Sequence, residues 1–261
     1  MEVVISTTAD EAGTLAADAI EELVRRRPEA VLGVATGSSP LIIYDELGRR
    51  VAQGSVSLAK ARAFMLDEYV GLPADHPQRY RNVIQAEFVD KVDIDPAHVF
   101  GPDGLAADLA DACEAYERAI ADVGGVDLQI LGIGTDGHIA FNEPGSSLAS
   151  RTRIKTLTSQ TRRDNARFFG GRVEAVPQHC LTQGTGTILQ ARHIVLVASG
   201  RGKAEAVHQL VEGPVSAMWP ATALQLHPHV TVLLDTAAAS RLQLASYYIE
   251  TYEGKPSWQG F

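Results

Sequence analysis

The segment Gly132 to Pro144, with the sequence GIGTDGHIAFNEP, brings together three side chains that could transfer protons. These are Asp136, His138 and Glu143. An imidazole titrates near neutral pH, and a carboxylate beside it can fix its tautomer and balance its charge. The spacing therefore indicates general acid/base chemistry. The alternative is a structural loop in which Asp136 forms the turn and His138 is a hydrogen-bonded polar side chain.

The glycines of this segment match G-x-G-x-x-G, the pattern of dinucleotide-binding turns. In such sites a helix begins at the turn, and its N-terminus receives the pyrophosphate. Here Pro144 and Gly145 follow closely and would interrupt a helix. We therefore expect a sharp turn and no nicotinamide or flavin cofactor.

Thr36, Gly37, Ser38 and Ser39 form a second polar cluster, directly before Pro40. We expect a helix to begin here with Pro40 at its first position, where the missing N–H is tolerated. Hydroxyl groups and free backbone N–H groups at a helix N-terminus bind anions. A phosphate site and ordinary serine capping both fit this pattern. The G-x-x-x-x-G-K-[ST] spacing is absent, so nucleoside triphosphate binding is not supported.

Asp67 and Glu68 end an apolar run and form the third cluster. Adjacent residues on a strand point to opposite faces, so at most one of these carboxylates is expected in a shared crevice. A partly desolvated carboxylate there could remove a proton next to a carbonyl group. A solvated acidic turn is the alternative. Arg167 and Lys203 are the candidates for charge on a phosphate group.

Composition excludes several other classes of protein. Cys113 and Cys180 lie far apart without a CxxC spacing, so we expect reduced thiols and no cysteine-rich zinc site. His227 and His229 flank a proline without a third ligand nearby, so no metal is expected. A net charge of -9 opposes nucleic-acid binding, which needs a basic face. A bound phosphate would then depend on local donors.

The apolar stretches are only as long as a strand, so no membrane-spanning helix is expected. The N-terminal sequence MEVVISTTADE lacks the basic region, the apolar region and the cleavage site of an export signal. We therefore expect a cytoplasmic protein.

Short β-branched runs alternate with longer helical patterns, which is typical of a parallel sheet covered by helices on both faces. The expected strands are Val3 to Ser6, Val31 to Ala35, Ala63 to Leu66, Val126 to Ile133, Ile154 to Leu157, His193 to Ala198 and Val230 to Leu234. The expected helices are Asp10 to Arg26, Leu41 to Gln53, Arg79 to Phe88, Leu105 to Ala121, Thr161 to Phe168, Lys203 to Val211, Thr222 to Leu226 and Ala237 to Tyr248. The polar clusters each follow a strand, so we expect them to meet at one edge of the sheet.

The stretches ATGSSP, MLDEYVGLPADHPQRY, LGIGTDGHIAFNEPGSS, TRIKTLT and MWPATALQLHP resemble the glucosamine-6-phosphate deaminase family, over nearly the whole chain. The resemblance implies a single Rossmann-like α/β domain over residues 1–261, with an open, mostly parallel sheet and a mobile lid near residues 153–182. It implies the conversion of glucosamine 6-phosphate and water to fructose 6-phosphate and ammonia, in amino-sugar catabolism and without a cofactor.

The same resemblance assigns roles to the candidate residues. His138 would open the sugar ring, with Asp136 and Glu143 orienting it and balancing its charge, and Asp67 would move a proton between C2 and C1. The phosphate of this small-molecule sugar phosphate would be held by a set comprising Thr36, Gly37, Ser38, Ser39, Arg167 and Lys203.

Some members of the family are hexamers activated by N-acetylglucosamine 6-phosphate at a site between subunits. Ser146, Arg153 and Lys155 match residues that resemble that site. The resemblance thus implies a homo-oligomer, as large as a hexamer, with this effector.

Two other functions remain open at this point. A 6-phosphogluconolactonase has a similar fold and an Asp-Gly-His turn, but the retained Glu143 favours the deaminase. A sugar-phosphate sensor resembling the effector domain of a repressor would need a DNA-reading module. The expected strand Val3 to Ser6 leaves no room for one before it.

Overall fold

The computed structural model describes residues 1–256 and 258–260. Their main sheet is seven-stranded, with the order β1-β10-β9-β6-β2-β3-β5, and every pairing in it is parallel. The strands are β1 (Glu2–Ser6), β2 (Val31–Val34), β3 (Arg62–Met65), β5 (Val99–Phe100), β6 (Leu128–Leu131), β9 (His193–Ala198) and β10 (Val230–Asp235). The predicted open, mostly parallel sheet is confirmed.

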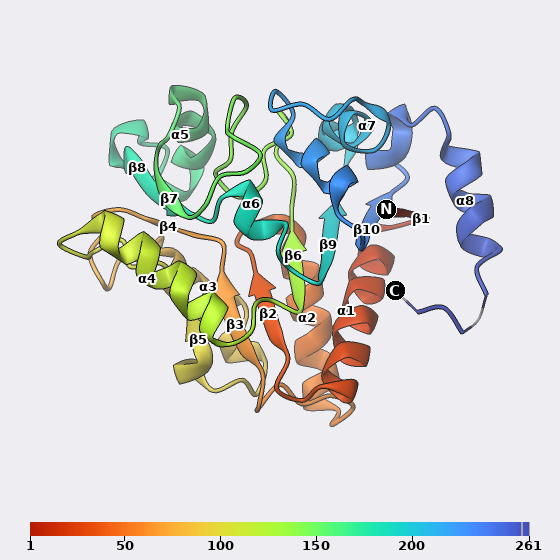
Figure 1. Ribbon diagram of the computed structural model, residues 1–261, viewed down its shortest axis with the longest axis horizontal. Coiled ribbons are helices and arrows are strands. Elements are labelled where there is room, and N and C mark those ends of the chain that lie inside the picture. The colour runs from red at the N-terminus through yellow and green to blue at the C-terminus, as the bar shows by residue number, and fades with distance from the viewer. Residues whose placement is uncertain (257, 261) are drawn as a thin grey trace.

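Helices cover both faces of this sheet (Figure 1). One face packs against α1 (Ala9–Arg26) and α2 (Ser38–Ala52). The other packs against α4 (Leu109–Asp122), the short α6 (Thr185–Ile188) and α7 (Ala204–Glu212). None of these helices, nor any other in the described part of the chain, has the length and apolar character needed to span a bilayer.

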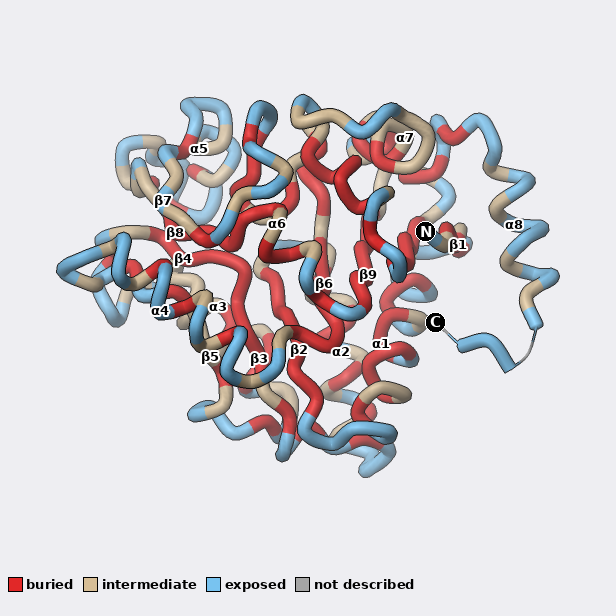
Figure 2. Tube along the Cα trace, viewed as in Figure 1, coloured by how far each residue is buried: buried red, intermediate tan, exposed pale blue. Residues whose placement is uncertain are grey.

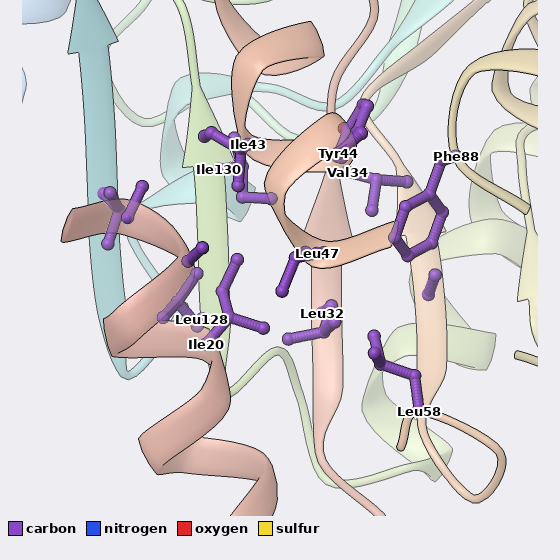
Figure 3. Packing of buried hydrophobic residues seen from close by; sticks show 14 of the residues in the cluster. Ile20, Leu32, Val34, Ile43, Tyr44, Leu47, Leu58, Phe88, Leu128 and Ile130 are labelled. Atoms are coloured by element: carbon purple, nitrogen blue, oxygen red, sulfur yellow. The ribbon is translucent and has the colours of Figure 1, made fainter. Parts of the chain in front are cut away.

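Alternate residues of each strand enter two separate apolar cores. Leu32 of β2 and Ile130 of β6 join the core under α1 and α2, where they pack near Ile20 and Leu47 (Figure 3). Leu131, the chain neighbour of Ile130, joins the core on the opposite face. The strands of the main sheet are mostly buried (Figure 2), because helices cover both faces to which their side chains point.

A second, three-stranded sheet has the order β4-β8-β7 and antiparallel pairing. It consists of β4 (Asp67–Tyr69), β8 (His179–Thr182) and β7 (Arg153–Thr156), with α5 (Ser159–Asn165) close to it in Figure 1. The expectation that Ile154 to Leu157 belongs to the parallel sheet is therefore wrong. The strands β4, β5 and β8, of two to four residues each, were not predicted.

The predicted helix from Ala237 to Tyr248 is wrong as a single element. The chain forms a short 3-10 helix at Ala238–Arg241 and then α8 (Ala245–Glu253). The Glu212 carboxylate accepts hydrogen bonds from the backbone N–H groups of Gln243 and Leu244, both at 2.9 Å. These contacts hold the backbone outside a continuous helix and give α8 a separate start. Helix α8 lies beside the edge strand β1.

Four other helices differ from the expected ones in their bounds or type. α3 spans Tyr80–Glu87, and α4 begins at Leu109 because the Asp108 side chain caps it. The predicted helix from Thr222 to Leu226 is a 3-10 helix at Pro220–Leu226. α2 begins at Ser38, so Pro40 is its third residue and not its first. Pro40 still lies in the first turn, where the backbone N–H has no helical partner.

Candidate active site

The strands β9, β6, β2 and β3 are neighbours in the main sheet, and a polar segment follows each of them: Ser199 to Lys203 after β9, Asp136 to His138 after β6, Thr36 to Ser39 after β2, and Asp67 with Glu68 after β3. Their carboxyl ends therefore lie side by side at one edge. From β2 the chain proceeds outward to β3 and β5, whereas from β6 it proceeds outward in the other direction to β9 and β10. This reversal between β2 and β6 is the position where open α/β sheets bind ligands.

His138 and Asp136 form a tight pair in the turn after β6. The Asp136 Oδ1 atom lies 2.6 Å from His138 Nδ1, and it also accepts the His138 backbone N–H at 3.2 Å. The hydrogen bond to His138 lowers the pKa of Asp136, so the carboxylate is ionised and acts as the acceptor. The proton then sits on Nδ1, which leaves Nε2 with a lone pair for a substrate hydroxyl.

Two glycines of this turn are needed for its shape. A Cβ atom at Gly134 would lie 2.2 Å from two atoms of the His138 ring. Gly137 has a φ of +78°, and a Cβ there would also lie 2.7 Å from the Trp219 ring. Ala140, two residues after His138, has a φ of 50°, which is unusual for a residue with a side chain. The glycines therefore allow the turn to form and leave space for the His138 ring. No helix starts at this turn.

Glu143 lies at the far end of the segment and is 6% exposed. Its carboxylate accepts hydrogen bonds from the hydroxyls of Thr158, at 3.4 Å, and of Thr161. Among the described residues, the His138 ring is hydrogen-bonded to Asp136 and not to Glu143. The sequence reasoning missed both threonines, although the TLTSQT stretch has the serine and threonine content of a helix start.

Asp67 is the first residue of β4 and is 7% exposed. No group in the described part of the chain donates a hydrogen bond to its carboxylate. Burial, and to a smaller extent the charge of Glu68, raises the pKa of Asp67 to about 8. Asp67 and Glu143 both act electrostatically on the buried thiol of Cys180, so the two carboxylates lie in one neighbourhood. Asp67 is therefore a candidate base in an apolar, hydroxyl-rich setting.

The predicted phosphate ligands lie around the pair formed by Asp136 and His138. Ser39, in the first turn of α2, packs against Gly132, where a Cβ atom would lie 3.7 Å from the Ser39 Cβ. Burial lowers the pKa of Lys203, while the charge of Asp136 opposes this shift and the charge of Arg167 adds to it. Lys203 and Arg167 thus lie close enough to act on one anion.

The backbone around these ligands suits an anion too. Gly37 has a φ of +107° and precedes the first residue of α2, Ser38. The Arg167 side chain is exposed and lies over the Phe168 ring, with 4.7 Å from Cζ to the ring centroid. The structure therefore offers a helix N-terminus and two cations at the same edge.

Two of the three residues predicted for an effector, Arg153 and Lys155, lie on β7. Arg153 and Lys155 alternate with the exposed Ile154, so the two cations share one face of the strand. The Ser146 side chain is 4% exposed, and its hydroxyl has no hydrogen-bond partner among the described residues. The predicted free thiols of Cys113 and Cys180 are confirmed, and both are buried.

These features define an α/β protein with a candidate proton-transfer site at the carboxyl edge of a parallel sheet. Residues 5–233 match the sequence profile of the family described as glucosamine-6-phosphate isomerases/6-phosphogluconolactonase. The chain belongs to this family.

Several relatives share the full length of the chain. It is 73% identical, over 260 residues and 100% of both chains, to a protein of Beutenbergia cavernae named glucosamine-6-phosphate deaminase. It is 70% identical, again over 100% of both chains, to a protein of the same name from Mycolicibacterium smegmatis.

Two solved structures have a similar fold. A structure described as a monomeric glucosamine-6-phosphate deaminase is 43% identical, with a TM-score of 0.89 over 92% of this chain and 100% of that one. A 6-phosphogluconolactonase from Trypanosoma brucei is 22% identical, with a TM-score of 0.74 over 92% of this chain and 98% of that one. The second likeness shows the fold alone.

Proposed function

We propose that this chain is a glucosamine-6-phosphate deaminase, which converts glucosamine 6-phosphate and water to fructose 6-phosphate and ammonia. The observation that carries the proposal is Asp67, a buried carboxylate without a hydrogen-bond donor in the described residues, at the same sheet edge as the pair of Asp136 and His138. Full-length relatives with this name support it.

The reaction begins with ring opening at His138. The Nε2 atom takes the proton of the anomeric hydroxyl and delivers one to the ring oxygen, which breaks the bond between C1 and that oxygen. Asp136 holds the proton on Nδ1 and stabilises the imidazolium that forms in between. Glu143 supports this step as a second carboxylate that balances the positive charge forming on His138.

Asp67 then moves the proton of the open sugar. Its carboxylate removes the proton at C2, which gives a 1,2-enolamine, and returns a proton to C1, which leaves an imine at C2. Water adds to this imine, and ammonia leaves to give the ketose. A base works best with a pKa near the working pH, and the pKa of about 8 meets that condition. Each such group contributes about 10² to 10⁴ in rate.

The phosphate is held at the start of α2 by Thr36, Gly37, Ser38 and Ser39, together with Arg167 and Lys203. Backbone N–H groups and hydroxyls supply donors, and the two cations supply charge. These local groups are what a chain with a net charge of -9 needs to hold an anion.

A lactonase is the second candidate, because the family includes both activities by its description. The assay that separates them supplies glucosamine 6-phosphate and 6-phosphogluconolactone to the purified protein in separate reactions. Release of ammonia with fructose 6-phosphate supports the deaminase. Lactone hydrolysis alone refutes it, and binding of either compound without turnover would instead support a sensor.

We also propose that residues 153–182 act as a lid over bound substrate. This segment carries Thr158 and Thr161, which bond to Glu143, and it carries Arg167. Hydrogen exchange of its backbone is expected to slow when a sugar-phosphate analogue binds. Unchanged exchange at saturating analogue would contradict the lid.

We propose further that the chain is a cytoplasmic homo-oligomer, as large as a hexamer, and that Ser146, Arg153 and Lys155 bind N-acetylglucosamine 6-phosphate. Two cations on one face and a buried hydroxyl without a partner among the described residues suit a phosphate ester. Light scattering and kinetics with this effector test the proposal, since the related solved structure is described as monomeric. A monomer whose rate ignores the effector contradicts it.

A further inference from the structure

Glu68, which follows Asp67 directly, points away from the candidate active site. Its side chain is buried, with the residue 1% exposed. The Oε1 atom accepts the backbone N–H groups of Tyr69 and Tyr80, both at 2.8 Å, and Oε2 accepts that of Arg81 at 2.9 Å. Burial raises the pKa of Glu68, and the three backbone N–H donors and the charge of Arg79 oppose that rise by stabilising the ionised carboxylate.

These contacts fasten β4 to the start of α3. The N-cap residue of α3, Arg79, provides no side-chain cap, so Glu68 satisfies the first free N–H groups of the helix. The Arg81 side chain in turn donates to the carbonyl groups of Pro96, at 3.1 Å, and Val99. Glu68 therefore connects the strand of Asp67 to α3, and through Arg81 to the start of β5.

Among the described residues, Glu68 is also the charged side chain that raises the pKa of Asp67. The other ionisable groups that respond to Asp67 are the hydroxyls of Tyr69 on β4, Tyr80 on α3 and Tyr116 on α4, and the thiol of Cys180 on β8. Burial raises the pKa of every one of them, so they are neutral at pH 7.

We propose that Glu68 is a positioning residue for the reaction: it fixes the direction of Asp67 by anchoring β4 on α3, and it keeps a negative charge directly behind that base. This inference rests on the proposed function for its catalytic meaning. Nothing in the adjacent sequence Asp67-Glu68 distinguishes the two carboxylates, whereas the contacts give each a separate task.

Glu68→Gln tests the proposal, because it keeps the shape and removes the charge. One amide oxygen can still accept, but the amide nitrogen then faces an N–H donor. We expect kcat to fall about 10- to 100-fold through loss of alignment, with KM nearly unchanged. The acidic limb of the pH profile should move to lower pH, since the pKa of Asp67 falls without the neighbouring charge.

Glu21→Gln is the matched control. Glu21 is also a buried carboxylate, 9% exposed and paired with Arg50 at 2.7 Å, but it lies on α1 and its partner lies on α2, so it touches neither β4 nor the start of α3. It is expected to change stability and to leave the pH profile in place. A shift of the profile in both variants would overturn the proposal.

A second measurement does not depend on turnover. Carboxyl ¹³C NMR of the free protein reports the titration of Asp67 directly, so it separates this inference from the proposed function. The Asp67 titration should move to lower pH in Glu68→Gln. It should move to higher pH in Arg79→Gln, because the negative charge of Glu68 then loses the guanidinium that offsets it, whose Nε lies 3.7 Å from Glu68 Oε2. If Glu68→Gln does not fold, the Arg79 variant still decides. An unmoved Asp67 titration, or full kcat in a folded Glu68→Gln, overturns the proposal.

Discussion

Burial in the folded protein disfavours the ionised form of Asp67. Asp67→Asn is therefore expected to stabilise the protein while it removes turnover. The side chain is 7% exposed, and burial raises its pKa from 3.8 to about 8. Between these pH values the folded chain keeps a proton that the unfolded chain has released. Stability linked to this proton is complete below about pH 4 and is lost as pH rises to about 8.

The magnitude follows from linkage. One proton changes the free energy of unfolding by about 1.4 kcal/mol per pH unit. Between pH 5 and pH 7 the wild type should therefore lose about 3 kcal/mol relative to Asp67→Asn, whose amide does not titrate. A gain in stability on removing an active-site charge is a known form of trade-off between stability and activity.

Urea unfolding of both proteins at pH 5, 6 and 7 measures this difference, because titrations of all other groups cancel between them. Asp75→Asn, at an exposed position, is the control and should follow the wild type at every pH. A stability gap that stays constant from pH 5 to pH 7 would refute the reasoning. It would show that Asp67 is ionised in the folded chain throughout that range.

Three further variants test the site. His138→Gln should impair turnover of cyclic substrate more than that of an open-chain analogue, because ring opening comes first; equal losses in steady-state assays would remove this role. Gly134→Ala should lower kcat/KM about 10- to 100-fold, since its Cβ would meet the His138 ring at 2.2 Å, and a normal rate would contradict the turn geometry. Lys203→Met should raise KM for the sugar phosphate about 10-fold or more with a smaller change in kcat, and an unaltered KM would exclude a phosphate contact.

The parallel sheet could be predicted from the sequence because its strands are buried on both faces and read as continuous apolar runs. His193–Ala198 is an example in which the predicted and observed bounds agree. The strand Asp67–Tyr69 could not be predicted, because its residues Asp67 and Glu68 have low strand propensity and its pairing partner Thr182 lies far along the chain. The same long-range pairing is what buries Asp67.

Within the candidate site, local contacts were easier to predict than distant ones. The pairing of Asp136 with His138 spans two residues and follows from their spacing. The contact of Glu143 with Thr161 depends on the fold of the 153–182 segment, which no periodicity in the sequence reveals. The contact of Glu68 with Tyr80 and Arg81 similarly needs the position of α3. Side chains whose partners lie on another element could be named from the sequence but not paired.

The exchange of the C2 proton of the substrate in heavy water is the most direct test of the proposed chemistry. The purified protein and Asp67→Asn are incubated with glucosamine 6-phosphate in D₂O, and deuterium at C2 of the recovered substrate and at C1 of the product is followed by NMR. The proposed mechanism predicts deuterium incorporation by the wild type and none by Asp67→Asn, although both still bind the sugar phosphate. Incorporation by Asp67→Asn at the wild-type rate would contradict the assignment of Asp67 as the base.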